Sequence, residues 1–325
     1  MSATQIQIEL NSSYYLNAIS FTILFYDYFL TLPAEVARYW TLLTRGQRRW
    51  NGASILFFAN RYLTLLGNIP VVIQYFWTTE PTEGKESALE TYHEYFIVVS
   101  QIIVGVLLIL RTYALYERNR LVLCFLLLIG VGVIVCGVYG TVFLGSPKER
   151  QPNLPLLIGC NYQIDHKQGI GLIYAWGSMG VFDIIIFFLT VHRALQFRRR
   201  SNGGALSLLS VLLRDGSIYF GVMVITNLCN IMTYIVGKDY TRGVATTFMN
   251  VISSVMISRL MLNIRDPALS GSSEYDSETL SGERTDVLFS TFLSSTENRI
   301  CRGFRSADST SAPGFLVADF VDPIV

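Results

Sequence analysis

The sequence predicts an all-α, polytopic membrane protein, a bundle of seven transmembrane helices with the N-terminus outside and a disordered cytoplasmic tail. Three observations predict this fold class. Only 15% of the 325 residues are charged and the mean hydropathy is +0.41, whereas soluble domains carry about 25% charged residues. Seven apolar runs approach the length needed to cross a bilayer. Lys and Arg are concentrated in alternate connecting loops.

The predicted spans follow from the apolar runs, because about 20 helical residues cover about 30 Å of hydrocarbon. The short outer N-terminus is expected at 1–13 and the membrane domain at 14–265. Residues 266–325 are rich in Ser, Thr and acidic residues, so we expect a disordered tail that offers sites for phosphorylation. The seven spans are expected at 14–32, 51–71, 94–110, 121–144, 169–191, 217–236 and 243–263.

Orientation follows from the basic residues of the short loops. The loops after the first, third and fifth runs contain twelve Lys and Arg, against six in the opposite loops. The richer set is expected in the cytoplasm, which places the N-terminus and the Asn11 sequon outside. The first ten residues contain no basic residue, so no cleaved signal peptide is expected. The plasma membrane is favoured over internal membranes by default.

The stretch "RTYALYERNR" at 111–120 closes the third apolar run with charged and aromatic side chains. Arg and Tyr side chains favour the cytoplasmic interface of a membrane helix. Two interpretations stay open: a plain anchor, or a conformational lock in which Arg111 pairs with an acidic group of a neighbouring helix in one state. Spacings of three and four residues predict one shared helical face for Tyr113, Tyr116, Glu117 and Arg120.

Residues 26–67 contain "YDYFLTL", "NRYL" and "LLG" and resemble an N-terminal domain of unknown function. This domain is found in a large family of seven-span membrane proteins of mushroom-type fungi. "RTYALYERNR" and "ISRLMLNIR" resemble later stretches of those proteins, so the similarity extends over 14–265. The segment between Trp40 and Trp50 is longer than the usual first inner loop of the family. The resemblance implies a topology and no activity.

Three ionisable residues are predicted inside the spans, where each costs about 2.5 to 3.5 kcal/mol unless it is paired or hydrated. Asp27, Arg61 and Asp183 lie on the first, second and fifth spans. Asp183 matches Arg61 best in depth, but helices joined by a short loop are usually neighbours. Asp27 is therefore the preferred partner of Arg61. Such a pair is either an inert contact that fixes helix register or a buried switch.

Polar side chains recur at three- and four-residue spacing on the second, sixth and seventh spans, so each set marks one helical face. In hydrocarbon such faces turn toward protein or water, and all three are expected in the bundle centre. They form either interhelical hydrogen bonds or a solvated cavity for a small-molecule ligand. The three sets are Asn60, Thr64 and Asn68; Thr226, Asn230 and Thr233; and Asn250, Ser254 and Ser258.

Small residues predict where helix backbones approach each other closely. On the fourth span these residues are Gly132, Cys136 and Gly140, and on the fifth span they are Gly171 and Ala175.

Enzyme chemistry is not expected. The three histidines, His93, His166 and His192, lie too far apart along the spans to converge on a metal ion. "GSMG" at 177–180 has no histidine nearby to act as a base, and no nucleotide-binding glycine loop occurs. We therefore expect no catalytic residue, no metal or other cofactor, and no nucleic-acid partner.

The favoured function is receptor-like or sensory signalling, with the lipid bilayer, a small-molecule ligand and a cytoplasmic signalling protein as partners. Against it, the sequence has neither the Asp/Glu-Arg-Tyr nor the Asn-Pro-x-x-Tyr motif of the commonest G-protein-coupled receptors. A small-solute transporter and a membrane scaffold are the alternatives. Against a transporter, no convincing helical repeat or pair of broken helices is evident.

Overall fold

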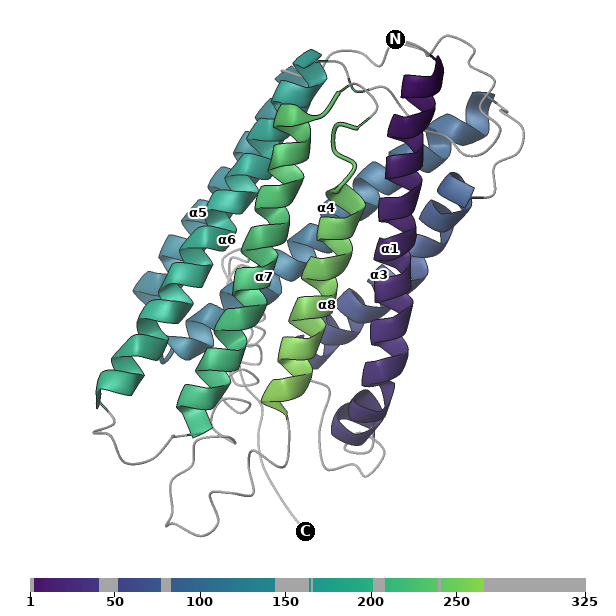
Figure 1. Ribbon diagram of the computed structural model, residues 1–325. Helices are drawn as coiled ribbons and strands as arrows, with labels where there is room; N and C mark the ends of the chain where they lie inside the picture. Colours follow the sequence, from purple (N-terminus) through teal and green to yellow (C-terminus); the bar gives the residue numbers. More distant parts are fainter. Residues whose placement is uncertain are drawn as a thin grey trace, which may run out of the picture.

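The computed structural model describes residues 3–40, 52–76, 83–143, 164, 166–200, 208–238 and 241–265, and this part of the chain contains helices and turns but no strand. The predicted tail at 266–325 lies outside the described residues. α1 begins at the end of the bundle opposite to the end where α8 stops (Figure 1). The elements are α1 (Ala3–Glu35) continued by the π-helix η1 (Val36–Trp40), α3 (Gly52–Phe76), α4 (Glu83–Leu115), α5 (Arg120–Val138) continued by the π-helix η2 (Tyr139–Phe143), α6 (His166–Arg200), α7 (Leu208–Val236) and α8 (Thr246–Ile264).

Six of the described helices, α3 to α8, are long and apolar enough to cross a bilayer. The chain is therefore an integral, multi-pass membrane protein. α1 has 33 residues and packs against α3 and α8, but it is not among these six. Its apolar stretch is interrupted by Asn17, Asp27 and several tyrosines. Residues 3–13, expected as an outer N-terminal segment, form the first turns of α1.

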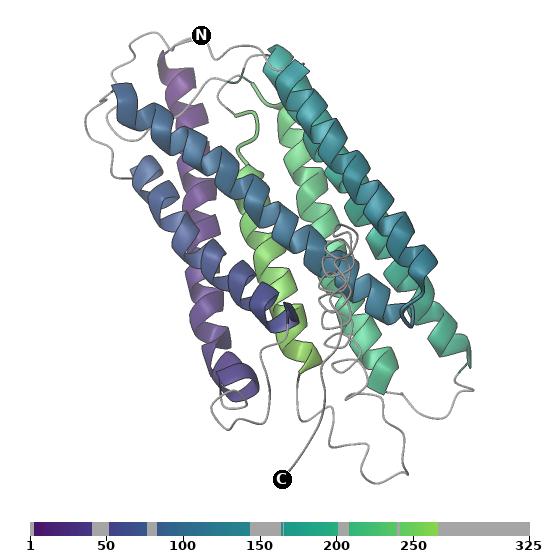
Figure 2. The same ribbon diagram turned by 180° about the vertical axis from the view of Figure 1, so that it is seen from behind.

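Helix α8 is the central helix of the bundle and packs against α1, α3, α4 and α7 (Figures 1 and 2). In the most apolar stretch of α8, 72% of the residues are buried, against only 6% in that of α5.

Helix α5 packs on α4 and α6 and exposes large apolar side chains such as Leu121, Leu128 and Val135. An exposed apolar face of this length fits hydrocarbon rather than water. By contrast α8, the last described helix, packs against α1, the first, so the spatial order of the helices differs from their order in the chain.

The first helical segment continues beyond residue 32, where the apolar run ends, through Glu35 and the π-helix η1. Aromatic packing explains the extension, because the ring of Tyr39 stacks on Phe57 of α3 with centroids 4.2 Å apart. The Arg265 guanidinium covers the Tyr39 ring at 4.0 Å. Phe57 belongs to the main apolar core, which α4 to α8 also supply through Leu107, Leu126, Ile186, Phe220 and Ile257.

Close backbone approach is confirmed at one of the predicted places. A Cβ at Gly140 would overlap the carbonyl oxygen of Gly171, so η2 and α6 touch there. The prediction is wrong for Gly132 and Cys136, because a Cβ at Gly132 would meet nothing within 4 Å and Cys136 is exposed. Both lie on the part of α5 that faces away from the bundle.

The turn that leads into α8 depends on Gly243. Its φ of 69° lies in the left-handed region, and a Cβ there would overlap the Tyr234 side chain. The Tyr234 hydroxyl in turn shares a hydrogen bond with Thr246 Oγ1 at 2.9 Å. α8 therefore begins at Thr246, three residues later than its apolar run predicts.

Candidate functional site

One face of α1 carries the charged groups around which the candidate site is built. Asp27, Thr31 and Glu35 follow one another at four-residue spacing and share that face. Asp27 is 4% exposed and Glu35 is fully buried. Buried carboxylates at this depth need a basic partner or hydrogen-bond donors.

Asp27 pairs with Arg259 of the central helix. Arg259 Nε donates to Asp27 Oδ1, joining α1 to α8. Five residues separate Arg259 from the end of α8 at Ile264, about 8 Å along the axis. At this depth the Arg259 side chain turns toward a buried carboxylate.

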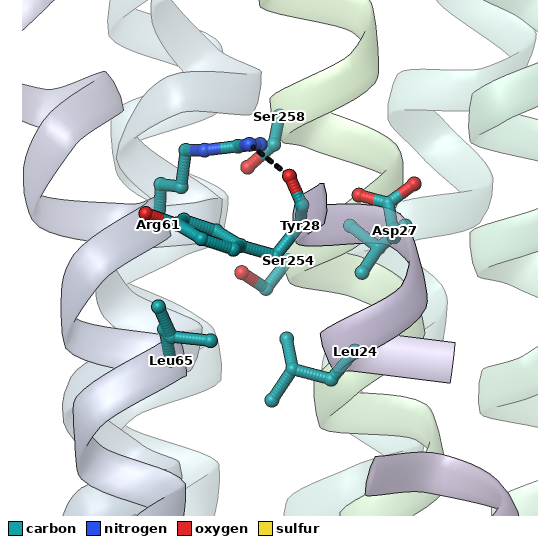
Figure 3. A pocket seen from close by; sticks show the side chains of 8 residues that line it. Leu24, Asp27, Tyr28, Arg61, Leu65, Ser254 and Ser258 are labelled. Carbon is teal, nitrogen blue, oxygen red and sulfur yellow. Dashed lines mark hydrogen bonds between the residues drawn. The ribbon is translucent and has the colours of Figure 1, made fainter. Parts of the chain in front are cut away.

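Arg61 of α3 pairs with Glu35, which the sequence analysis placed beyond the end of the first span. The Arg61 Nε to Glu35 Oε2 distance is 2.6 Å, and the two side chains are 4% and 0% exposed. The predicted Arg61–Asp27 pair is therefore wrong, and so is the alternative with Asp183. Arg61 Nη2 also donates to the Tyr28 carbonyl oxygen at 3.1 Å (Figure 3). The same nitrogen donates to Thr31 Oγ1 at 2.8 Å.

Two further donors complete the environment of Glu35. The Tyr62 hydroxyl donates to Glu35 Oε1 at 2.8 Å, and the Trp40 indole Nε1 donates to the same oxygen at 2.9 Å. Both carboxylate oxygens of Glu35 thus face donors or positive charge. We call Asp27–Arg259 and Glu35–Arg61 the α1 ion pairs. They attach α1 to the two helices against which it packs.

Polar side chains connect α3 directly to α8. Asn60 Nδ2 donates to the Ser254 carbonyl oxygen at 3.1 Å and to Ser258 Oγ at 3.0 Å. Ser254 Oγ donates to Thr64 Oγ1 at 2.8 Å. All four side chains are buried, at most 3% exposed. They form interhelical hydrogen bonds between α3 and α8.

A small cavity lies between α1, α3 and α8, next to the α1 ion pairs (Figure 3). It leaves about 10 Å³ for the centre of a water molecule, which is close to the room that one water needs. A pocket for a drug-sized ligand has about 300 Å³ or more. In this conformation the cavity therefore admits water and not an organic ligand. Its lining residues are Leu24, Asp27, Tyr28, Arg61, Leu65, Ser254, Val255 and Ser258.

The other predicted polar set does not meet the first across a shared cavity, because α8 lies between α3 and α7. Asn230 of α7 is buried and accepts from Thr246 Oγ1 at 3.0 Å. Thr226 and Thr233 donate to carbonyl oxygens of α7 itself. Thr233 is only half-buried, so this set does not turn inward along its whole length.

In the other half of the bundle, further polar contacts attach α8 to its neighbours. Asn250 accepts from Gln101 Nε2 of α4 at 2.8 Å, a contact that the sequence analysis did not identify. Asn68 donates to the Thr64 carbonyl oxygen of its own helix at 2.6 Å. α8 is therefore bound by side-chain hydrogen bonds to α3, α4 and α7.

Asp183 of α6 lies apart from the α1 ion pairs. It is 6% exposed and accepts from Asn227 Nδ2 of α7 at 2.9 Å. The third predicted buried charge therefore belongs to the α6–α7 interface.

The predicted shared face of Tyr113, Tyr116, Glu117 and Arg120 does not exist. α4 ends at Leu115, and Glu117 and Arg118 have φ values of 53° and 63° in a left-handed turn before α5. Arg111 and Tyr113 are buried on α4, with 9% and 6% exposed. The charged contact that the structure shows at this turn joins Glu117 to Arg193 of α6.

Tyr116 links the same turn to α6. Its hydroxyl donates to the Leu189 carbonyl oxygen at 2.9 Å, and the Arg193 guanidinium lies 5.6 Å from its ring centroid. Burial raises the pKa of the Tyr116 phenol, and the Arg193 charge partly opposes that rise. The hydroxyl therefore stays a donor at neutral pH.

The comparison with known proteins found a match over part of the chain, mainly in α1 and α3. Residues 15–66 match a family described as a family of unknown function (DUF6533). This segment contains three members of the α1 ion pairs, Asp27, Glu35 and Arg61. No curated protein and no solved structure matches the chain. Within the described residues, no three His, Cys, Asp or Glu side chains are grouped so that they could hold a metal ion.

Proposed function

We propose that the chain is a receptor-like signalling protein that crosses the membrane seven times with its N-terminus outside. In this proposal α8 is the helix that moves on activation. The long α1 helix beside α3 and α8 supports a seventh span, as does the resemblance to fungal seven-span proteins. The basic residues within 38–49, 111–120 and 193–214 support the orientation. A small-molecule ligand, a cytoplasmic signalling protein and a plasma-membrane location are parts of the same proposal.

One observation carries the proposal: the central helix is attached to α1 by the Asp27–Arg259 ion pair. A buried ion pair is stable when both partners meet, and it is costly when one partner is left alone in the bundle. An element held in this way has two distinct arrangements rather than a continuous range. Since α8 leads directly into the predicted cytoplasmic tail, breaking this pair would change the surface presented to a partner.

The packing of α8 favours signalling over solute transport. Transport needs a path for the solute, but the cavity beside the α1 ion pairs admits only about one water molecule. Hydrogen bonds from Asn60 and Ser254 occupy the contact between α3 and α8. These contacts support a bundle that transmits a change of helix position.

The proposal is tested in cells that carry the full chain with an N-terminal epitope tag. Resonance-energy-transfer sensors for each class of heterotrimeric G protein, together with cAMP and Ca²⁺ sensors, report signalling. Asp27→Asn leaves Arg259 without its carboxylate, so we expect a raised ligand-independent response at equal surface level. Asp27→Arg combined with Arg259→Asp restores a pair of reversed polarity and returns the response toward the wild-type level.

The control variant is Tyr26→Phe, which changes an exposed neighbour of Asp27 and leaves the ion pair intact. Antibody staining of intact cells reports the N-terminal tag only if that end lies outside. If Asp27→Asn reaches the surface and every response stays at the wild-type level, signalling through α8 is ruled out. Solute flux into vesicles containing the purified protein then separates a transporter from a scaffold.

A further inference from the structure

Asp183 and Asn227 face each other near the middle of the bilayer. Asp183 lies 16 and 13 residues from the ends of the α6 span Lys167–Gln196, and Asn227 lies 11 and 9 residues from those of the α7 span Gly216–Val236. Asp183 is 6% exposed and Asn227 fully buried. Their one bond runs from Asn227 Nδ2 to Asp183 Oδ2 at 2.9 Å. The carboxyl group is therefore remote from both aqueous phases.

Among the described residues, no basic side chain is placed to neutralise an ionised Asp183. α6 packs against α4, α5, α7 and η2. The central parts of these elements, 94–110, 121–143, 169–191 and 217–236, contain no Lys, Arg or His. Asp183 forms no ion pair with any described residue. An ionised carboxylate that is buried in hydrocarbon without a positive partner costs several kcal/mol.

One oxygen atom of the Asp183–Asn227 pair also lacks a hydrogen-bond donor. Asn227 Oδ1 is buried and has no hydrogen-bond partner among the described residues. An ionised carboxylate can only accept, so it leaves this oxygen unsatisfied. A protonated carboxyl group carries one O–H donor. A single added proton therefore removes the unpaired charge and supplies the missing donor.

The contact between α6 and α7 is tight at this level. One turn before Asp183, a Cβ at Gly180 would lie 3.2 Å from Ile231 and 3.7 Å from Asn227 Oδ1. Such packing favours a small occupant at the pair, and a proton is the smallest.

We propose that Asp183 and Asn227 form a proton-binding site. Asp183 is a neutral carboxylic acid at pH 7, which accepts from Asn227 Nδ2 and donates its O–H to Asn227 Oδ1. The proton is taken up from water, and no other bond is broken. Two hydrogen bonds then join α6 to α7, and loss of the proton would leave a charge that only water entering between these helices could stabilise. This site does not depend on the signalling proposal, only on α6 and α7 crossing the bilayer.

Other titratable groups on the surrounding elements are too distant or too exposed to replace the proton. On α6 itself, Tyr174 and His192 each lie nine residues away, about 13 Å along the axis. On α4, a Cβ at Gly105 would lie 4.0 Å from the ring of Phe182, and Arg111 is a further six residues along that helix, about 9 Å. The remaining titratable groups of these central parts are Glu94 and the exposed Tyr95 on α4, the exposed thiols of Cys124, Cys136 and Cys229, and Tyr139, Tyr219 and Tyr234.

The test uses infrared spectroscopy on the full chain in lipid nanodiscs at pH 7. A protonated carboxylic acid has a C=O stretching band at higher frequency than carboxylate or amide groups. Water-exposed aspartates are ionised at this pH, because their ordinary pKa is about 3.9. We expect a band of about one carboxyl group per chain that shifts on ¹³C-aspartate labelling. Asp183→Asn abolishes it, whereas the control Asp27→Asn removes an ion-paired carboxylate and retains it.

The wild-type spectrum is decisive even if Asp183→Asn fails to fold. A wild-type chain without an aspartic-acid band at pH 7 overturns the proposal. A band that persists unchanged in folded Asp183→Asn also overturns it, because the proton then resides on another group. In Asn227→Leu the carboxyl group loses both amide partners, so we expect the band to move to higher frequency, and an unmoved band contradicts the pairing.

Discussion

Arg259 of α8 donates its Nε–H to Asp27 of α1 across 232 positions of sequence. This contact attaches the last described helix to the first. Because Arg259 supplies the positive charge next to Asp27, this buried aspartate does not require Arg61 of the second span as its partner.

Removing the carboxylate in Asp27→Asn should lower the stability of the bundle by about 1.5 to 3 kcal/mol, the range for hydrogen bonds to charged groups. The cost stays below that of a fully buried pair, because the Arg259 side chain is 34% exposed and keeps access to water. Thermal unfolding in detergent measures the change. An unaltered midpoint would show that the pair contributes nothing.

Arg61→Met should be more destabilising, by about 3 to 5 kcal/mol, because it leaves Glu35 buried without a counter-charge. Glu35→Gln combined with Arg61→Met should recover part of this loss, since no charge then remains unpaired.

A double-mutant cycle identifies the partner of Arg61 directly. We expect a coupling of more than 1 kcal/mol between Glu35 and Arg61, and less than about 0.5 kcal/mol between Asp27 and Arg61. The opposite order of the two couplings would restore the partner that the sequence favoured.

Backbone strain at Arg118 gives a further prediction. A non-glycine residue in the left-handed region costs about 1 to 2 kcal/mol, and Arg118 has a φ of 63°. Arg118→Val should lower stability by about 1 kcal/mol relative to wild type, since β-branched side chains tolerate this region least. Arg118→Gly should be neutral or slightly stabilising. Equal unfolding midpoints for the Val and Gly variants would contradict the left-handed turn.

Gly243→Ala should shift the start of α8. The backbone at this position has a positive φ, which alanine disfavours, and the added methyl group would overlap the Tyr234 side chain. We therefore expect the stability to fall by about 1 to 3 kcal/mol. Amide hydrogen exchange should rise in the first turn of α8 at Thr246 and Thr247. Gly132→Ala is the matched control, since its added methyl group meets nothing within 4 Å. Equal exchange in both variants would show that the turn does not depend on Gly243.

The helix ends show where hydropathy stops being informative. α4 begins at Glu83 and α7 at Leu208, well before the apolar runs that start near 94 and 217. Hydropathy marks only the part of a helix that lies in hydrocarbon, whereas a helix continues as long as its backbone bonds are satisfied. Glu35 lies beyond the apolar run and is therefore not assigned to the first span, although its spacing of eight residues from Asp27 places both on one helical face.

The sequence by itself determined that the chain is a helical, multi-pass membrane protein and that Asp27, Arg61 and Asp183 are buried. These properties follow from local composition, because hydrocarbon requires apolar helices and penalises every charge within them. Only the tertiary structure decided which groups pair, since pairing depends on which helices are neighbours. Because α8 lies beside α1, Asp27 pairs with Arg259, and Arg61 pairs with Glu35. Within the part of the chain that the structure describes, Asp183 on α6 has only the amide of Asn227 as its partner.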